Sequence, residues 1–135
     1  MITTTGKSVQ QVLDELAVTL IKQGRRCLKN TGHLTNGEVC VYGDNNGNHC
    51  GIGWLLPCDR LDLMLYMGSL STLLDENIDL GPNDSFIRKN KSLLSLIQSL
   101  HDLKSYIYRR ITSEKISSNF GINMSSWTRW IELGE

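Results

Sequence analysis

The chain has 135 residues, with 14 basic and 14 acidic side chains and a hydrophobic content of 40%. This length fits a single domain over residues 1–135, which can bury roughly two-thirds of its unfolded surface without disulfides or metal. The zero net charge excludes the basic excess of a non-specific DNA binder and the acidic excess of a DNA mimic. No apolar run reaches the roughly 18 residues of a membrane span, and the first residues lack the apolar core of a signal peptide. We therefore expect a soluble cytoplasmic α+β protein that has no membrane contact and keeps its cysteines as thiols.

A first amphipathic helix is predicted to begin after Ser8. Ser8 and Gln11 have the spacing of a capping box, and Gly24 can end the helix in the left-handed conformation. Apolar residues recur between them at helical spacing, so one face should pack on the rest of the domain. This stripe consists of Val9, Val12, Leu13, Leu16, Ala17, Leu20 and Ile21. The preceding residues 1–7 are expected to be flexible.

An antiparallel β-hairpin is predicted over about residues 38–54. Residues 38–42 and 49–54 have the pattern of strands, and Asn46-Gly47 is the preferred pair for a two-residue type I′ turn. Strand alternation then places five apolar residues on one buried face, namely Val39, Val41, Cys50, Ile52 and Trp54. Gly51 and Gly53 fall on the other face, where they leave room for Tyr42 or for a closely packed helix.

Four to five mostly short helices are expected after this hairpin. Two of them cover residues 59–67 and 70–76, the second with Ser69 as its N-cap. A later helix carries the stripe Leu93, Leu96, Ile97 and Leu100. Beyond it, Asp102 caps a further helix that bears Leu103, Ile107, Ile111 and Phe120, or the two run on as one helix. Gly121 ends this region, and residues 123–135 form a C-terminal extension with a short helix.

The cysteines and histidines do not have the spacing of a metal site. Six of them crowd into residues 27–58, but neither Cys-x-x-Cys nor His-x-x-x-His occurs. Hairpin alternation also puts Cys40 and Cys50 on opposite faces, so they cannot share an ion. We expect no metal and no cofactor, with the cysteines acting as small apolar side chains. The sequence leaves open whether any of Cys27, Cys40, Cys50 or Cys58 is reactive.

A cysteine nucleophile can be assembled in two ways, from Cys50 with His101 or from Cys58 with His33. A catalytic thiol needs a histidine within hydrogen-bond reach and a third group that orients it. His101 and Asp102 are adjacent, which makes a hydrogen bond between their side chains awkward on a helix. We therefore read Asp102 as a helix cap and His101 as a partly buried packing residue. A small cysteine- or histidine-dependent enzyme stays an alternative.

The residues singled out for contact with a partner lie near the C-terminal end. Tryptophan is enriched at interaction hot spots, and Trp127 and Trp130 share one side of a helix. They either clamp the last helix onto the body or contact a partner. The pair Arg109-Arg110 lies among tyrosines, which would suit a nucleic-acid patch or a solvated face. Without a net positive charge, nucleic acid is not the favoured partner.

Two segments resemble a group of small phage and prophage proteins. That group has the pattern C-x-Y, a glycine turn and C-A-x-G-x-L-I-P-D, followed by a leucine-rich helix that ends in Q-x-x-H-D. The matching residues are Cys40-Val41-Tyr42, Gly47 to Pro57 and Gln98-Ser99-Leu100-His101-Asp102. The chain departs from the pattern at Gly51, at Cys58 and over residues 59–86. The match spans residues 8 to about 122.

This resemblance implies a viral or mobile-element origin and no particular catalytic activity. Small accessory proteins of phages commonly bind one host protein and modulate or inhibit it. The expectation that follows is a host-takeover or anti-defence protein, located in the host cytoplasm. The alternatives are the enzyme named above and a nucleic-acid-binding accessory protein, and self-association is left open.

Overall fold

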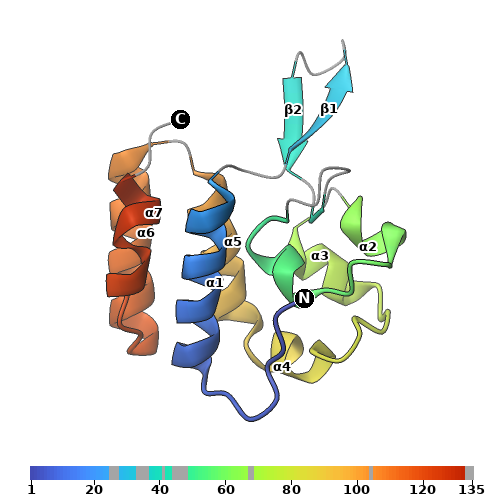
Figure 1. Ribbon diagram of the computed structural model, residues 1–135, viewed down its shortest axis with the longest axis horizontal. Helices are drawn as coiled ribbons and strands as arrows, with labels where there is room; N and C mark the ends of the chain where they lie inside the picture. The colour runs from blue at the N-terminus through green and yellow to red at the C-terminus, as the bar shows by residue number, and fades with distance from the viewer. Residues whose placement is uncertain are drawn as a thin grey trace.

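The fold is a small, mostly helical domain, known from a computed structural model (Figure 1). The structure describes residues 1–24, 28–32, 37–40, 42–43, 49–66, 69–103 and 105–132, with the backbone alone for 28–32 and 37–40. The helices are α1 (Val9–Gln23), η1 (Ile52–Leu55), α2 (Leu61–Met64), α3 (Leu70–Asp75), α4 (Asp84–Lys89), α5 (Lys91–Asp102), α6 (Tyr106–Phe120), η2 (Ser125–Trp127) and α7 (Thr128–Glu132). The strands are β1 (Leu28–Gly32) and β2 (Gly37–Cys40). An N-terminal helix followed by several short helices is thus confirmed.

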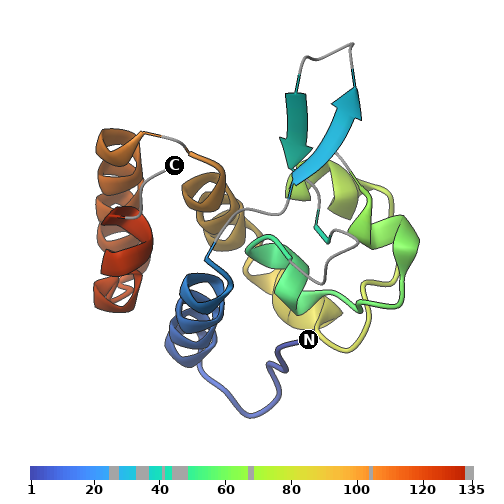
Figure 2. The ribbon, with the colours of Figure 1, turned by 45° about the horizontal axis from the view of Figure 1, so that its top comes forward.

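Helix α5 lies at the centre of this arrangement. It packs against α6 on one side and against α3, α4 and η1 on the other. Helix α1 contacts η2 and α7, which also packs on α6. Figures 1 and 2 show these C-terminal helices at one edge of the molecule and α2 to α4 at the opposite edge. One continuous hydrophobic core runs between them and includes residues from α1, η1 and α3 to α7.

Helix α1 has the features that the sequence predicts. The Ser8 side chain accepts the N–H of Gln11, and the Gln11 side chain accepts the N–H of Ser8, which completes the capping box. Gly24 closes the helix in the left-handed conformation, with φ of 79°. The buried face consists of Val12, Leu13, Leu16, Ala17 and Leu20. The predicted cap, stop and packed face of this helix are therefore confirmed.

The hairpin predicted over about residues 38–54 does not form in that register. Strand β2 pairs antiparallel with the preceding β1, with Leu28 opposite Cys40, and the pair extends away from the helical body (Figures 1 and 2). In place of a return strand, residues 52–55 form the 3₁₀-helix η1. Among the described residues, the two predicted strands are joined by the hydrogen bond from the Cys50 N–H to the Tyr42 carbonyl oxygen, beside an isolated bridge between Gly43 and His49. The side chains of residues 39 and 41 and the Asn46-Gly47 turn lie outside the described part.

A helical pattern explains why residues 52–56 leave the strand conformation. Ile52, Leu55 and Leu56 recur at helical spacing, and all three are fully buried. A strand would have turned Leu55 to the face opposite Ile52. A Cβ on Gly53 would overlap the carbonyl oxygen of Tyr42. The glycine therefore admits the backbone of Tyr42, and not the Tyr42 ring or a helix as the sequence suggests.

The start of the chain is held by one buried amide. Residues 1–7 are expected to be flexible, but Ile2 and Thr4 are buried. The Asn83 side chain, only 1% exposed, accepts the N–H and the hydroxyl of Thr4 at 3.1 and 3.0 Å. It donates to the carbonyl oxygens of Ile2 and Leu55 at 2.6 and 3.0 Å. Asn83 thereby joins the first residues, the end of η1 and the beginning of α4.

The helices after residue 57 differ from prediction mainly around residue 102. Ser69 caps α3 as expected, and Gly121 ends α6 with φ of 65°. Asp102 is not a cap, because it is the last residue of α5, and Ser105 caps α6 instead. The region is neither one continuous helix nor a helix capped at residue 102. Six α-helices follow α1 in the described residues, rather than four to five.

Candidate protein-contact surface

Helix α6 presents apolar side chains to solvent as well as to the core. Successive residues of an α-helix are rotated by about 100°, so its inward face carries Arg109, Ser113 and Ile116, all buried. The opposite face carries Ile107, Tyr108 and Ile111. Their exposed fractions are 65%, 61% and 53%. Helix α6 therefore has an apolar face that the rest of the fold does not cover.

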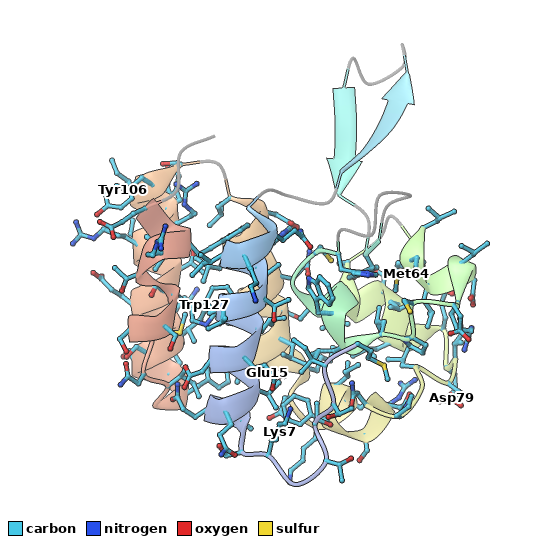
Figure 3. All side chains as sticks on the ribbon, viewed as in Figure 1. Lys7, Glu15, Met64, Asp79, Tyr106 and Trp127 are labelled. Atoms are coloured by element: carbon cyan, nitrogen blue, oxygen red, sulfur yellow. The ribbon has the colours of Figure 1, made fainter. Side chains whose placement is uncertain are left out.

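Tyr106 is a further exposed aromatic side chain at the beginning of the helix, about 100° around the helix axis from Ile107. It is 45% exposed, and Figure 3 shows it at the outer end of α6, pointing away from the helical body. Ile107, Tyr108 and Ile111 together are called the outward α6 face below, and Tyr106 lies beside this face. The sequence places Ile107 and Ile111 on a helix but does not show which side of the helix they take. The inward face instead holds Arg109 and Ser113, so a search for the more apolar side of this helix would have chosen the wrong side.

The two adjacent arginines of α6 have different roles. Arg109 is 5% exposed, and its guanidinium donates to the backbone oxygens of Ile131 at 2.8 Å and of Leu103 at 3.0 Å. It thus joins the end of α7 to the end of α5. Arg110 is exposed and lies 3.7 Å from Glu114 on the next turn. In this conformation only Arg110 is placed for contact with a partner.

Trp127 and Trp130 lie inside the fold. Trp127 is fully buried and Trp130 is 5% exposed, and Figure 3 shows Trp127 between α7 and α1. The Trp130 ring stacks on the His101 ring, with centroids 5.1 Å apart and planes 9° from parallel. Of the two uses that the sequence allows, the structure shows the packing of the last helix onto the body. A partner could reach these rings only if η2 and α7 moved.

A groove of about 390 Å³ runs between α6 and the segment of η2 and α7. Its base contains Met124 and Ile131, which are 9% and 7% exposed. Hydroxyl and charged groups surround this base, and Tyr106 lies between the groove and the outward α6 face. The complete lining is Tyr106, Arg110, Ser113, Glu114, Ser117, Met124, Ser125, Thr128, Ile131 and Glu132. No single stretch of sequence contains these residues, so pattern reading could not assemble them.

The two segments that carry the phage resemblance meet in one buried hydrogen-bond network. The thiol of Cys50 donates to Gln98 Oε1 at 3.4 Å, and the N–H of Ile52 donates to the same oxygen at 3.2 Å. Gln98 Nε2 donates to Asp102 Oδ1 at 3.2 Å. This oxygen lies 2.9 Å from His101 Nδ1, so the prediction that the adjacent pair avoids a hydrogen bond is wrong. His101 Nε2, by contrast, is buried and has no hydrogen-bond partner in the described part of the chain. Hydrogen bonds shared in this way specify how two segments pack.

This network brings Cys50 and His101 to one region without the contacts of a catalytic pair. The described hydrogen bonds direct the thiol to Gln98 and His101 Nδ1 to Asp102. Cys50 and His101 are fully buried, whereas a nucleophile must reach its substrate. Cys58 is exposed, and its proposed partner His33 lies outside the described residues. The network therefore serves packing, with Asp102 at its solvent side.

The described residues contain no group of three or more metal-ligating side chains that could hold an ion. Cys27 and His33 lie outside that part of the chain, and the side chain of Cys40 is not described, so metal independence stays a prediction. Across the described ranges, no helix is long and apolar enough to cross a membrane.

Comparison of the chain with protein-family models, with curated proteins and with solved structures gave no match.

Proposed function

We propose that this protein acts by binding another protein through the outward α6 face. The observation that carries the proposal is the exposure of Ile107 and Ile111, 65% and 53%, on a helix whose other side is packed. Together with Tyr108 they offer an exposed patch of a few hundred Å², a size at which apolar patches are often functional. Exposure of these apolar side chains to water adds nothing to the stability of the isolated domain.

The chemistry of this face suits an apolar protein surface. Tyrosine and isoleucine supply rigid contact area at the centre, and aromatic residues are enriched in the cores of interfaces. The charges beside them are mixed, with Arg110 and Lys115 next to Glu114. A standard interface buries about 800 Å² per partner, so a partner that binds the outward α6 face would also cover this charged rim.

Nucleic acid fits the same surface less well. Affinity for phosphates requires several accessible cations, and the arginine pair that suggested such a patch contributes only Arg110, because Arg109 donates to buried backbone oxygens. The exposed tyrosines would then be left without the positive field that brings a nucleic acid to them. A partner protein is the better match.

The resemblance to phage and prophage proteins supplies the proposed identity of that partner. On this ground we propose a host protein that the chain modulates or inhibits, such as a component of host defence. A protein that works in this way needs no catalytic group of its own. Binding of a second copy of the chain to the outward α6 face is the competing outcome that the experiment must separate.

The experiment compares three proteins in quantitative co-purification from host lysate. They are the wild type, the double variant Ile107→Lys/Ile111→Lys and the control Leu61→Lys. Leu61 is 69% exposed on α2, so the control introduces one lysine, half the charge added by the double variant, at a comparably exposed apolar position elsewhere. Any recovered partner is then purified and titrated against all three. Light scattering on the chain alone reports self-association.

A specific partner should bind wild type and Leu61→Lys equally and bind the double variant at least tenfold more weakly, since central contacts of this kind are worth 1–2 kcal/mol or more. Equal binding by all three proteins would remove the outward α6 face from the proposal. Dimerisation that only the double variant abolishes would assign the face to a second copy instead.

A further inference from the structure

We propose that the groove between α6 and α7 receives a basic side chain, lysine or arginine, of the bound partner. This inference rests on the proposed function, because the groove adjoins the outward α6 face through Tyr106. A partner segment that crosses the outward α6 face can therefore place one side chain in the groove. The identity of that side chain follows from the lining.

The base of the groove fits the methylene part of a long side chain. Met124 and Ile131 form this apolar base, and both side chains are almost covered by the surrounding structure. Lysine and arginine combine an apolar stem with a charged end, and such side chains bury the stem while the charge stays at a polar rim. The volume of about 390 Å³ is within the range of sites that accept a group of this size.

The inner part of the groove contains a hydroxyl, that of Ser113, which is able to accept a hydrogen bond. Ser113 is 8% exposed and lines the groove, and among the described hydrogen bonds none involves its side chain. The Ser113 oxygen is not one of the buried polar side-chain atoms that lack a hydrogen-bond partner, so it stays open to the solvent of the groove. It can accept a hydrogen bond from a group inserted above Met124. Ser117 and Thr128 add further acceptors nearby.

The charges of the lining favour a cation over an anion. Glu114 lies on the α6 wall and Glu132 on the α7 wall, against the single guanidinium of Arg110. Arg110 and Glu114 are 60% and 71% exposed and 3.7 Å apart, so their ion pair contributes little and is readily exchanged. An inserted ammonium or guanidinium would gain two carboxylates. A phosphate or carboxylate would meet both of them in repulsion.

The test uses small probes and the full-length protein in amide-resolved NMR titrations. The probes are N-acetyl-arginine methylamide, the norleucine analogue with a similar stem and no charge, and the glutamate analogue. The proteins are the wild type, Glu114→Gln/Glu132→Gln and the control Asp75→Asn, which removes an exposed carboxylate from α3. Spectra of the variants outside the groove show whether the fold is kept.

The arginine probe should shift amides of the groove, such as those of Ser113 and Thr128, and should bind at least threefold more tightly than either analogue. The double variant should weaken this binding about threefold or more, as expected for two exposed ion pairs, and Asp75→Asn should not. Equal shifts with norleucine, or no effect of the double variant, would overturn the inference.

The groove and the outward α6 face can fail separately. Ile107→Lys/Ile111→Lys leaves the groove lining intact, so it should lose the partner and keep the arginine probe. If the probe does not bind but the partner does so through the isoleucines, only the groove assignment falls. If the probe binds and no partner depends on the isoleucines, only the proposed function falls.

Discussion

Replacement of Trp127 by alanine should destabilise the fold more than any surface change in the same helix. The indole is fully buried, and the 3₁₀-helix η2 that carries it packs against α1 and α7. A tryptophan buries on the order of 200 Å² or more, which at about 25 cal/mol per Å² gives an upper value near 5 kcal/mol. Since part of the space is not refilled, the expected loss of unfolding free energy is about 3–5 kcal/mol. For a domain of this size the melting temperature should fall by roughly 10–20 °C.

The matched control is Trp127→Phe. Phenylalanine keeps most of the buried area and removes the indole N–H, which has no hydrogen-bond partner among the described residues. Its expected cost is under about 2 kcal/mol, because relief of that unsatisfied donor offsets part of the lost volume. Urea titrations followed by circular dichroism measure both. A Trp127→Ala protein as stable as wild type would show that the indole does not pack in the core, and would return it to the partner-binding candidates.

Three other changes test separate contacts of the fold. Arg109→Met should lower the free energy of unfolding by about 2–3 kcal/mol, because it leaves buried carbonyl oxygens without their donor. Arg110→Met should lower it by under about 0.5 kcal/mol, and equal losses in urea titrations would contradict the different roles of the two arginines. Asn83→Ala should lower the free energy of unfolding by about 2–4 kcal/mol, because buried groups of Ile2, Thr4 and Leu55 lose their hydrogen-bond partner. An unchanged melting curve would mean that these hydrogen bonds do not hold the start of the chain. The backbone N–H of Leu80 and, after it, the guanidinium of Arg88 hold the pKa of the Asp84 carboxyl below its usual value of 3.8. The stability that this carboxylate contributes is therefore present above the unfolded-state pKa and is lost as the pH falls through the folded-state pKa. Asp84→Asn should therefore show a shallower loss of stability between about pH 5 and 2 than wild type does, and parallel profiles would refute this.

The sequence predicts helix α1 well because all of its signals are local. The capping box, the left-handed glycine and the apolar stripe each act within a few residues of one another, so tertiary contacts add to them without changing them. Residues 52–56 show the opposite case. Alternation suggested a strand, but Ile52, Leu55 and Leu56 also fit helical spacing, and the burial of all three decided between the two patterns.

The candidate surface was predictable only in part, for a geometric reason. Arg109 and Arg110 are chemically identical neighbours, and the rotation of about 100° between them sends one into the core and the other into solvent. Periodicity alone does not fix the absolute orientation of a helix that has apolar residues on both sides. The same ambiguity hid the exposure of Ile107 and Ile111, whereas the burial of Trp127 was one of the two uses that the sequence allows.

The hydrogen bonds of Asn83 also bear on how the domain folds and opens locally. The Thr4 N–H reaches an acceptor 79 residues away along the chain, and contacts of such long range form late because a large loop must close first. The amide proton of Thr4 is therefore protected from solvent only while α4 and the end of η1 are both in place. Its hydrogen-exchange rate would therefore report whether η1 and α4, on one side of α5, are packed on the first residues, and it would register local opening of this contact before the core itself unfolds.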